Sequence, residues 1–159
     1  MTKMQDITCQ LFEYVCAGCG EHYKAPVLYG GYGVFLLRNY ADFSYRYLNV
    51  LEDSIFSEVE SIIERSEKVS SLSKYERVDL FQKIVGVAYD ENECGNSYGI
   101  DAEPECPFCK KHAVRKSIAT NPPEYVEMQV PMATHHKWDN LSQVDRERLV
   151  GEKLRRLLD

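Results

Sequence analysis

Two short segments, Tyr14-Val15-Cys16-Ala17-Gly18-Cys19-Gly20 and Glu105-Cys106-Pro107-Phe108-Cys109-Lys110, decide how this chain is organised. Each segment contains a C-x-x-C pair, in which one tight turn can present both sulfurs to one ion. Four thiolates about 2.3 Å from Zn²⁺ complete a tetrahedral structural site with no position left for water or substrate. The spacing therefore predicts one structural zinc ion, with Cys16, Cys19, Cys106 and Cys109 as its ligands.

Other uses of paired cysteines remain open at this point. A C-x-x-C pair can act as a thiol–disulfide couple when its first cysteine lies at a helix N-terminus, and neither pair heads an evident helix here. Ordinary disulfides or free thiols are a further alternative. No apolar run approaches the roughly 20 residues needed to span a bilayer, and the first residues do not lead into a signal-peptide apolar region. We therefore expect a cytoplasmic protein, in which paired cysteines are typically metal ligands.

The two segments resemble the knuckles of the four-cysteine zinc-ribbon class. The resemblance covers only the knuckles and their flanking strands, and it implies one zinc ion held by two β-hairpin turns. The departure is the insertion of 86 residues between Cys19 and Cys106, where compact ribbons have roughly 15–20. Lengthening a loop by this amount costs on the order of 1.3 kcal/mol, which is far less than the about 10–16 kcal/mol apparent binding energy of a structural zinc ion.

The hydrophobic pattern predicts an α+β fold in a single domain. Residues 6–16 alternate like a strand that leads to Cys16, and residues 21–28 are expected to return antiparallel to it. Apolar residues from 39 to 65 recur at three- and four-residue steps, which predicts an amphipathic helix roughly 35 Å long. Ser73 and Glu76 fit a capping box for a second helix that ends near residue 89 and forms an antiparallel hairpin with the first.

The end of the chain predicts a strand over residues 125–130 and a final helix over 140–158, with Ser142 as its cap. The expected architecture is a zinc-ribbon-like β-hairpin frame (6–38 and 105–134). A helical insertion (39–104) and the C-terminal helix are added to this frame.

The charge is uneven along the chain. The net charge is −6, whereas residues 41–105 hold fifteen acidic and six basic residues, a difference of −9. A largely helical acidic segment would attract a basic protein partner, with Glu52, Glu58 and Glu60 as candidate contacts. A small acidic protein in a metal frame is similar in character to bacterial toxin-immunity proteins, so we interpret this chain as a zinc-stabilised protein-binding module.

The alternative is a zinc-ribbon protein associated with nucleic acid or transcription. It depends on the basic residues beside the second knuckle, because clustered Lys and Arg neutralise phosphates. These residues are Lys110, Lys111, His112, Arg115 and Lys116, with a possible contribution from Arg146, Arg148, Arg155 and Arg156. An acidic chain is not expected to offer a broad surface of this kind.

No catalytic signature is evident, so we expect no enzymatic activity. The sequence lacks H-E-x-x-H, P-loop and Ser/His/Asp patterns, and His22 is the only histidine between the knuckles, where an HNH-type nuclease would place its catalytic one. His22 and His112 each stand three residues after a knuckle and could replace a cysteine ligand. His135 and His136 form either a polar turn before the last helix or a general base or partner contact.

Two cysteines lie outside the predicted ligand set. Cys9 falls on the inward face of the first predicted strand and is expected to be a small core residue. Cys94 lies in an acidic loop without nearby basic residues to stabilise a thiolate. Neither is a good candidate nucleophile.

Overall fold

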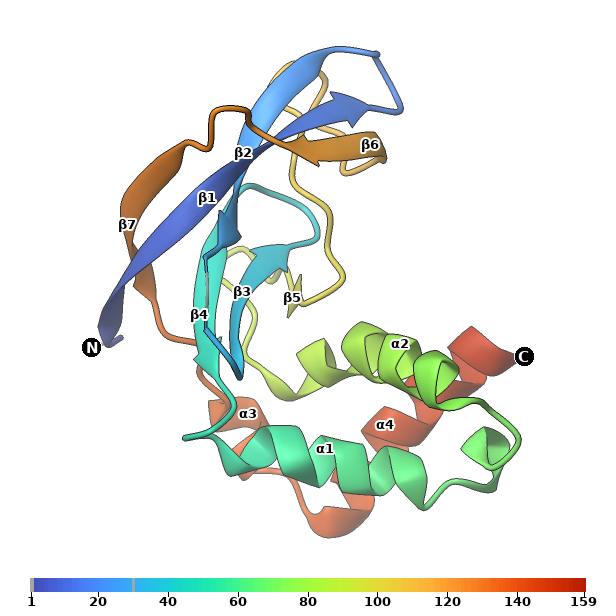
Figure 1. The fold of residues 1–159 in the computed structure, drawn as a ribbon. Coiled ribbons are helices and arrows are strands. Elements are labelled where there is room, and N and C mark those ends of the chain that lie inside the picture. The colour runs from blue at the N-terminus through green and yellow to red at the C-terminus, as the bar shows by residue number, and fades with distance from the viewer. Residues whose placement is uncertain (1, 30) are drawn as a thin grey trace.

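The computed structural model describes residues 2–29 and 31–159, and it has two antiparallel sheets and a group of helices. The predicted α+β class is confirmed. Figure 1 shows the larger sheet extending away from the helices, with the smaller sheet between them. The strands are β1 (Met4–Cys16), β2 (His22–Leu28), β3 (Val34–Asn39), β4 (Tyr45–Asn49), β5 (Tyr98–Gly99), β6 (Val114–Ala119) and β7 (Tyr125–Pro131). The helices are α1 (Ser54–Glu64), α2 (Lys74–Ile84), α3 (His136–Asp139) and α4 (Gln143–Leu158), with the 3-10 turns η1 (Glu67–Val69) and η2 (Val85–Ala88).

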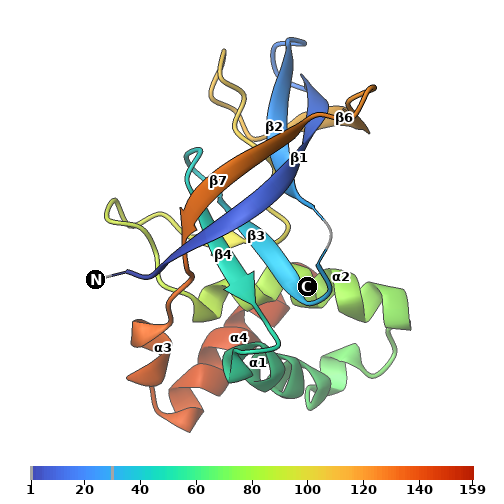
Figure 2. The same cartoon turned by 60° about the vertical axis from the view of Figure 1, so that its left-hand side comes forward.

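Strand β1 is the spine of the larger sheet. It pairs along one edge with β2, from Cys9 opposite Leu28 to Val15 opposite His22. Along its other edge the first half pairs with β7 and the second half with β6, all antiparallel. The predicted strands over residues 6–16, 21–28 and 125–130 are therefore confirmed, and the second knuckle reaches the first because β6 continues along β1 (Figure 2).

The predicted long helix over residues 39–65 is wrong in its first half. Residues 34–39 and 45–49 instead form β3 and β4, which pair with each other, and β5 adds to β3. Asn39 and Asp42 accept backbone hydrogen bonds from Ala41 and Ser44 and so make the turn between these strands. Helix α1 begins only after the cap residue Asp53 and has 11 residues, which is about 16 Å. Aromatic residues such as Tyr45 and Tyr47 favour the strand.

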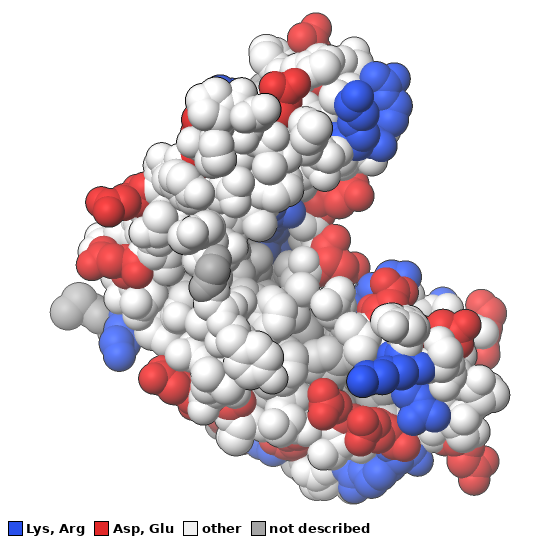
Figure 3. Space-filling view, viewed as in Figure 1, with Lys and Arg blue, Asp and Glu red and all other residues white. Residues whose placement is uncertain are grey.

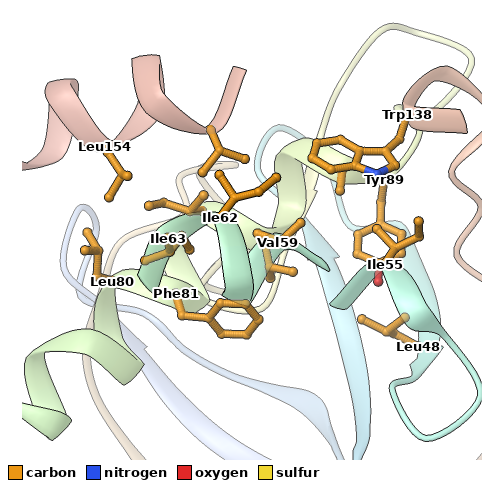
Figure 4. Packing of buried hydrophobic residues seen from close by; sticks show 14 of the residues in the cluster. Leu48, Ile55, Val59, Ile62, Ile63, Leu80, Phe81, Tyr89, Trp138 and Leu154 are labelled. Carbon is orange, nitrogen blue, oxygen red and sulfur yellow. The ribbon is translucent and has the colours of Figure 1, made fainter. Parts of the chain in front are cut away.

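The helices pack around the main core of the molecule. The capping box at Ser73 and Glu76 and the cap at Ser142 are both confirmed. The chain reverses through η1 between α1 and α2, and α4 packs against both helices. Figure 4 shows Val59, Ile62 and Phe81 meeting in this core, with Trp138 and Tyr89 closing one end.

The two sheets are joined by a small apolar cluster and by one arginine. Ile7, Cys9 and Val130 of the larger sheet are buried together against side chains of β3 and β4. Arg38 on β3 donates to the carbonyl oxygen of Pro26 at 3.0 Å and to the Tyr14 hydroxyl at 3.1 Å. The outer part of the larger sheet is therefore held in place by a polar anchor in addition to packing.

Candidate metal centre

The two knuckles have the same backbone turn, as the sequence predicts. In the first, the Cys16 amide donates to the Glu21 carbonyl and the Gly20 amide to the Cys16 carbonyl. In the second, the Cys106 amide donates to Lys111 and the Lys110 amide to Cys106 in the same way. Gly20 and Lys110 occupy the equivalent position with positive φ angles of 77° and 66°. One turn type therefore presents both cysteine pairs.

The four predicted ligands lie together. Each of the sulfurs of Cys16, Cys19, Cys106 and Cys109 is within 4.8 Å of the others. Two contacts join the knuckles to each other: Cys16 Sγ to Cys109 Sγ at 3.5 Å and Cys19 Sγ to Cys106 Sγ at 3.7 Å. A tetrahedron with metal–sulfur bonds of about 2.3 Å has edges of about 3.8 Å. The sulfurs thus have the spacing of one tetrahedral site and could hold one metal ion.

Backbone amides stabilise the thiolate form of Cys16. The Cys19 amide, and the Gly18 amide at 3.3 Å, point at the Cys16 sulfur. These amides, Cys19 first, outweigh burial and lower the pKa of Cys16 to about 6. The Glu21 amide acts in the same direction on Cys19, but burial and the neighbouring sulfurs raise the pKa of Cys19 to about 12. Four thiolates so close together require a cation, since metal ligands bind deprotonated.

Each knuckle is followed by a histidine whose Nδ1 atom contacts a glutamate residue. His22 Nδ1 lies 2.9 Å from Glu13 Oε1, and His112 Nδ1 lies 2.9 Å from the carbonyl oxygen of Glu103. In both cases the partner stands nine residues before the histidine. The described metal-capable cluster contains the four cysteines and neither histidine. His22 and His112 therefore contact residues that flank the knuckles and do not belong to the cysteine cluster.

The other two cysteines lie away from this centre. Cys9 is fully buried between the sheets, and burial raises its pKa to about 11. Its predicted role as a core residue is confirmed. Cys94 is exposed in the loop between η2 and β5.

The three glutamates proposed as partner contacts do not share one environment. Glu52 and Glu60 are exposed, and no ion pair to either is found among the described residues. Glu58 instead accepts hydrogen bonds from Arg146 at 2.8 Å and from the Trp138 indole at 3.3 Å. Glu58 therefore joins α1 to α3 and α4, a role that helical periodicity could not reveal because both partners lie more than 75 residues away.

The two adjacent histidines belong to the start of α3. His135 Nδ1 lies 2.9 Å from the Asp139 carboxylate, and His135 Nε2 lies 3.7 Å from Asp53 Oδ1. The His136 amide donates to Asp90, which also receives the Lys137 amide and the Thr134 hydroxyl. The predicted polar turn is thus a short helix capped by Asp90. The sequence could not reveal this cap, because Asp90 stands 45 residues before His135 and no sequence motif fixes that separation.

The basic residues beside the second knuckle are gathered on its outer end. Lys110, Lys111, Arg115 and Lys116 are all exposed, and no carboxylate pairs with them among the residues that the structure describes. By contrast, Arg146 and Arg148 pair with Glu58 and Asp145. Arg155 and Arg156, the other two arginines of this group, are exposed on α4, and no carboxylate pairs with them among the described residues. Carboxylates therefore neutralise only part of the second group.

Comparisons with known proteins do not extend this picture: no protein-family model matches the chain, and neither a curated protein nor a solved structure is significantly similar to it. Within residues 2–29 and 31–159, no helix has the length and apolar character that crossing a membrane requires.

Proposed function

We propose that this chain is a non-catalytic, zinc-stabilised module that binds a basic protein, in the manner of an immunity protein that inhibits a basic toxin such as a nuclease. The observation that supports the proposal is a set of exposed carboxylates, on α1 and on the residues beside it, that form no ion pair within the described residues. Within the described residues, Glu52, Glu60, Glu64 and Glu67 are exposed and have no basic partner within 4.0 Å. Unpaired charges of one sign favour encounter with a partner of the opposite sign.

Zinc is the metal that best suits four thiolates in a closed tetrahedral arrangement. In this proposal the ion stabilises the knuckles and leaves binding to the rest of the molecule. Elemental analysis of the purified protein should find close to one zinc ion per chain. Absence of metal, together with unchanged stability of Cys16→Ser and Cys106→Ser, would remove zinc from the proposal.

The partner surface is tested by charge reversal on α1 and its entry. Glu52→Lys combined with Glu60→Lys should abolish capture of a basic protein from native cells, because each change replaces an attraction by a repulsion. Glu58 stays unchanged, since its loss would leave Arg146 unpaired and disturb the fold.

The matched control reverses two exposed glutamates outside the acidic segment. Glu21 ends the first knuckle, Glu127 lies on β7, and both are exposed, so Glu21→Lys with Glu127→Lys makes the same change in net charge. Capture should survive in this control. Equal loss in both variants, or retention in both, would contradict a role for the α1 carboxylates.

A second candidate function, association with nucleic acid, is supported by the unpaired basic residues of the second knuckle. The blue patch on the outer arm in Figure 3 shows basic side chains gathered at this end of the molecule. Phe108, in the same knuckle, is 63% exposed and offers a ring for base stacking.

Salt dependence separates the two candidates. Binding to generic single-stranded DNA or RNA should weaken steeply with salt if several phosphates are neutralised, and Lys111→Glu with Arg115→Glu should reduce both the affinity and the slope. The Glu52→Lys, Glu60→Lys variant should not lose this binding. No measurable affinity at low salt would exclude the second candidate.

A further inference from the structure

A groove runs between α1 and α2 on the helical side of the molecule. Its volume is about 430 Å³, and its floor is apolar, formed by Ile63, Val69, Leu72 and Phe81. Val78 lines the groove and is 49% exposed, and Tyr75, one turn before it on α2, is 86% exposed. This apolar strip is uncovered in the single chain.

The two walls of the groove carry opposite charges. Glu60 and Glu64 line it from α1, whereas Lys74 and Arg77 line it from α2. Arg77 donates to the carbonyl oxygens of Leu72 and Ser70. In the part of the chain that the structure describes, no ion pair within 4.0 Å crosses the groove. Figure 3 shows acidic and basic side chains interleaved over the helices.

We propose that this groove binds a second copy of the same chain in a two-fold symmetric dimer. In an isologous contact the same patch meets itself after a half turn. When the two-fold axis runs along the groove, the α1 wall of one copy faces the α2 wall of the other. Glu60 and Glu64 then lie opposite Lys74 and Arg77 of the other copy, twice over. Val78 lines the groove, so Val78 of each copy then packs against the apolar floor of the other copy.

Partners of one charge sign fit this groove less well. A purely basic segment is repelled by Lys74 and Arg77, and a purely acidic one by Glu60 and Glu64. A second copy places basic side chains opposite the acidic wall and acidic side chains opposite the basic wall. The inference goes beyond the proposed function, because it concerns the isolated protein and requires no other partner. A second copy and a basic partner protein would compete for Glu60 and Glu64.

The test uses two single substitutions that the helices themselves tolerate. Glu64→Lys places a base in the last turn of α1, and Lys74→Glu places an acid in the first turn of α2, both of which the helix dipoles favour. Both side chains are exposed. A loss of dimer in either variant is therefore a change at the interface and not a loss of fold. Glu60 is left unchanged because its reversal already belongs to the partner-capture experiment.

Sedimentation equilibrium over a concentration series measures the association. Wild-type protein should approach twice the 18.4 kDa mass of the chain. Each substitution occurs twice in the dimer, so each variant should raise the dissociation constant by roughly tenfold or more, the equivalent of about 1.4 kcal/mol. An equimolar mixture of Glu64→Lys and Lys74→Glu should restore association as a heterodimer, because each reversed wall then faces a complementary one.

The control is Glu67→Lys, an exposed glutamate in η1 that does not line the groove. It should leave the dissociation constant unchanged. A wild-type protein that stays monomeric throughout the series would overturn the proposal. A dimer that responds equally to the groove variants and to the control, or that mixing does not restore, would overturn it as well by placing the contact elsewhere.

Discussion

The knuckle arm (residues 11–28 and 103–120) and the helical lobe (residues 50–90 and 134–159) are stabilised in different ways. The lobe shares a core cluster of 17 buried residues with β3, β4 and β5. The arm has a buried cluster of five, Tyr14, Cys16, Tyr23, Ala25 and Cys106, and two of these are candidate metal ligands. Burial of apolar area therefore accounts for the lobe, whereas the small cluster of the arm includes two of the four cysteines that could hold a metal ion.

Metal removal should have the largest effect, because we expect it to destabilise the knuckle arm and leave the helical lobe folded. Chelation, or Cys16→Ser, should release an ion whose apparent binding energy is about 10–16 kcal/mol. Amides of β2 and β6 should then exchange rapidly, while those of α1, α2 and α4 stay protected, as measured by hydrogen exchange. Cys94→Ser is the control, since Cys94 is exposed and outside the cluster. Simultaneous loss of protection in the helices would show that the arm and lobe unfold as one unit.

A core substitution in the lobe should have the next largest effect. Trp138 is 1% exposed, donates to Glu58, and lies under the Arg146 guanidinium at 5.5 Å from the ring centroid. Trp138→Ala should lower the free energy of unfolding by about 3–5 kcal/mol, because it leaves a cavity and removes one of the two hydrogen bonds that Glu58 accepts. Urea denaturation measures this loss. Tyr75→Ala, at a highly exposed position, should cost almost nothing, and zinc content should be unchanged in both variants.

A smaller effect concerns the stability of the lobe, which should depend on pH through the carboxylate of Asp90. Burial opposes ionisation of Asp90, but hydrogen bonds from Thr134 and from the Lys137 and His136 amides outweigh it and lower its pKa. A depressed folded-state pKa adds stability above the unfolded-state pKa, and this contribution is lost as the pH falls through the folded value.

Replacement of Asp90 measures that contribution. Asp90→Asn should cost about 1–2 kcal/mol at neutral pH, and the difference from wild type should shrink in acid below the usual carboxyl range. Denaturant melts at several pH values provide the test. A difference that does not change with pH would show that the charge of Asp90 contributes nothing.

The smallest expected effects compare the two knuckles within the arm. Gly20→Ala should destabilise the arm by about 1 kcal/mol, because a side chain at positive φ is strained, and Lys110→Gly should stabilise it by a similar amount. No heavy atom lies within 4 Å of a Cβ added at Gly20, so the effect is one of backbone conformation. Thermal melts of the zinc-loaded variants measure both changes. Effects of the same sign would contradict the equivalence of the two turns.

Features of the fold that depend on neighbouring residues were predictable from the sequence. The strand that leads to Cys16, its return, the Ser73 capping box and the Ser142 cap all have local signals at fixed spacing. The sheet formed by β3, β4 and β5 was not predicted. Residues 45–49 satisfy helical steps as well as strand alternation, and only pairing with Phe35 and Leu37 across the sheet selects the strand.

The cysteine pairs by themselves determined where four thiol ligands stand in this chain, because C-x-x-C spacing confines two sulfurs to one turn. Only the tertiary structure decided that both pairs meet, since β6 and the second knuckle reach Cys16 by pairing along β1. It also decided which acidic residues stay available at the surface. Glu58 is bonded to Arg146, 88 residues later, whereas Glu60 stays exposed. The physical reason is that ligand spacing is a local property, whereas a charge is neutralised or left free by contacts that chain folding brings from afar.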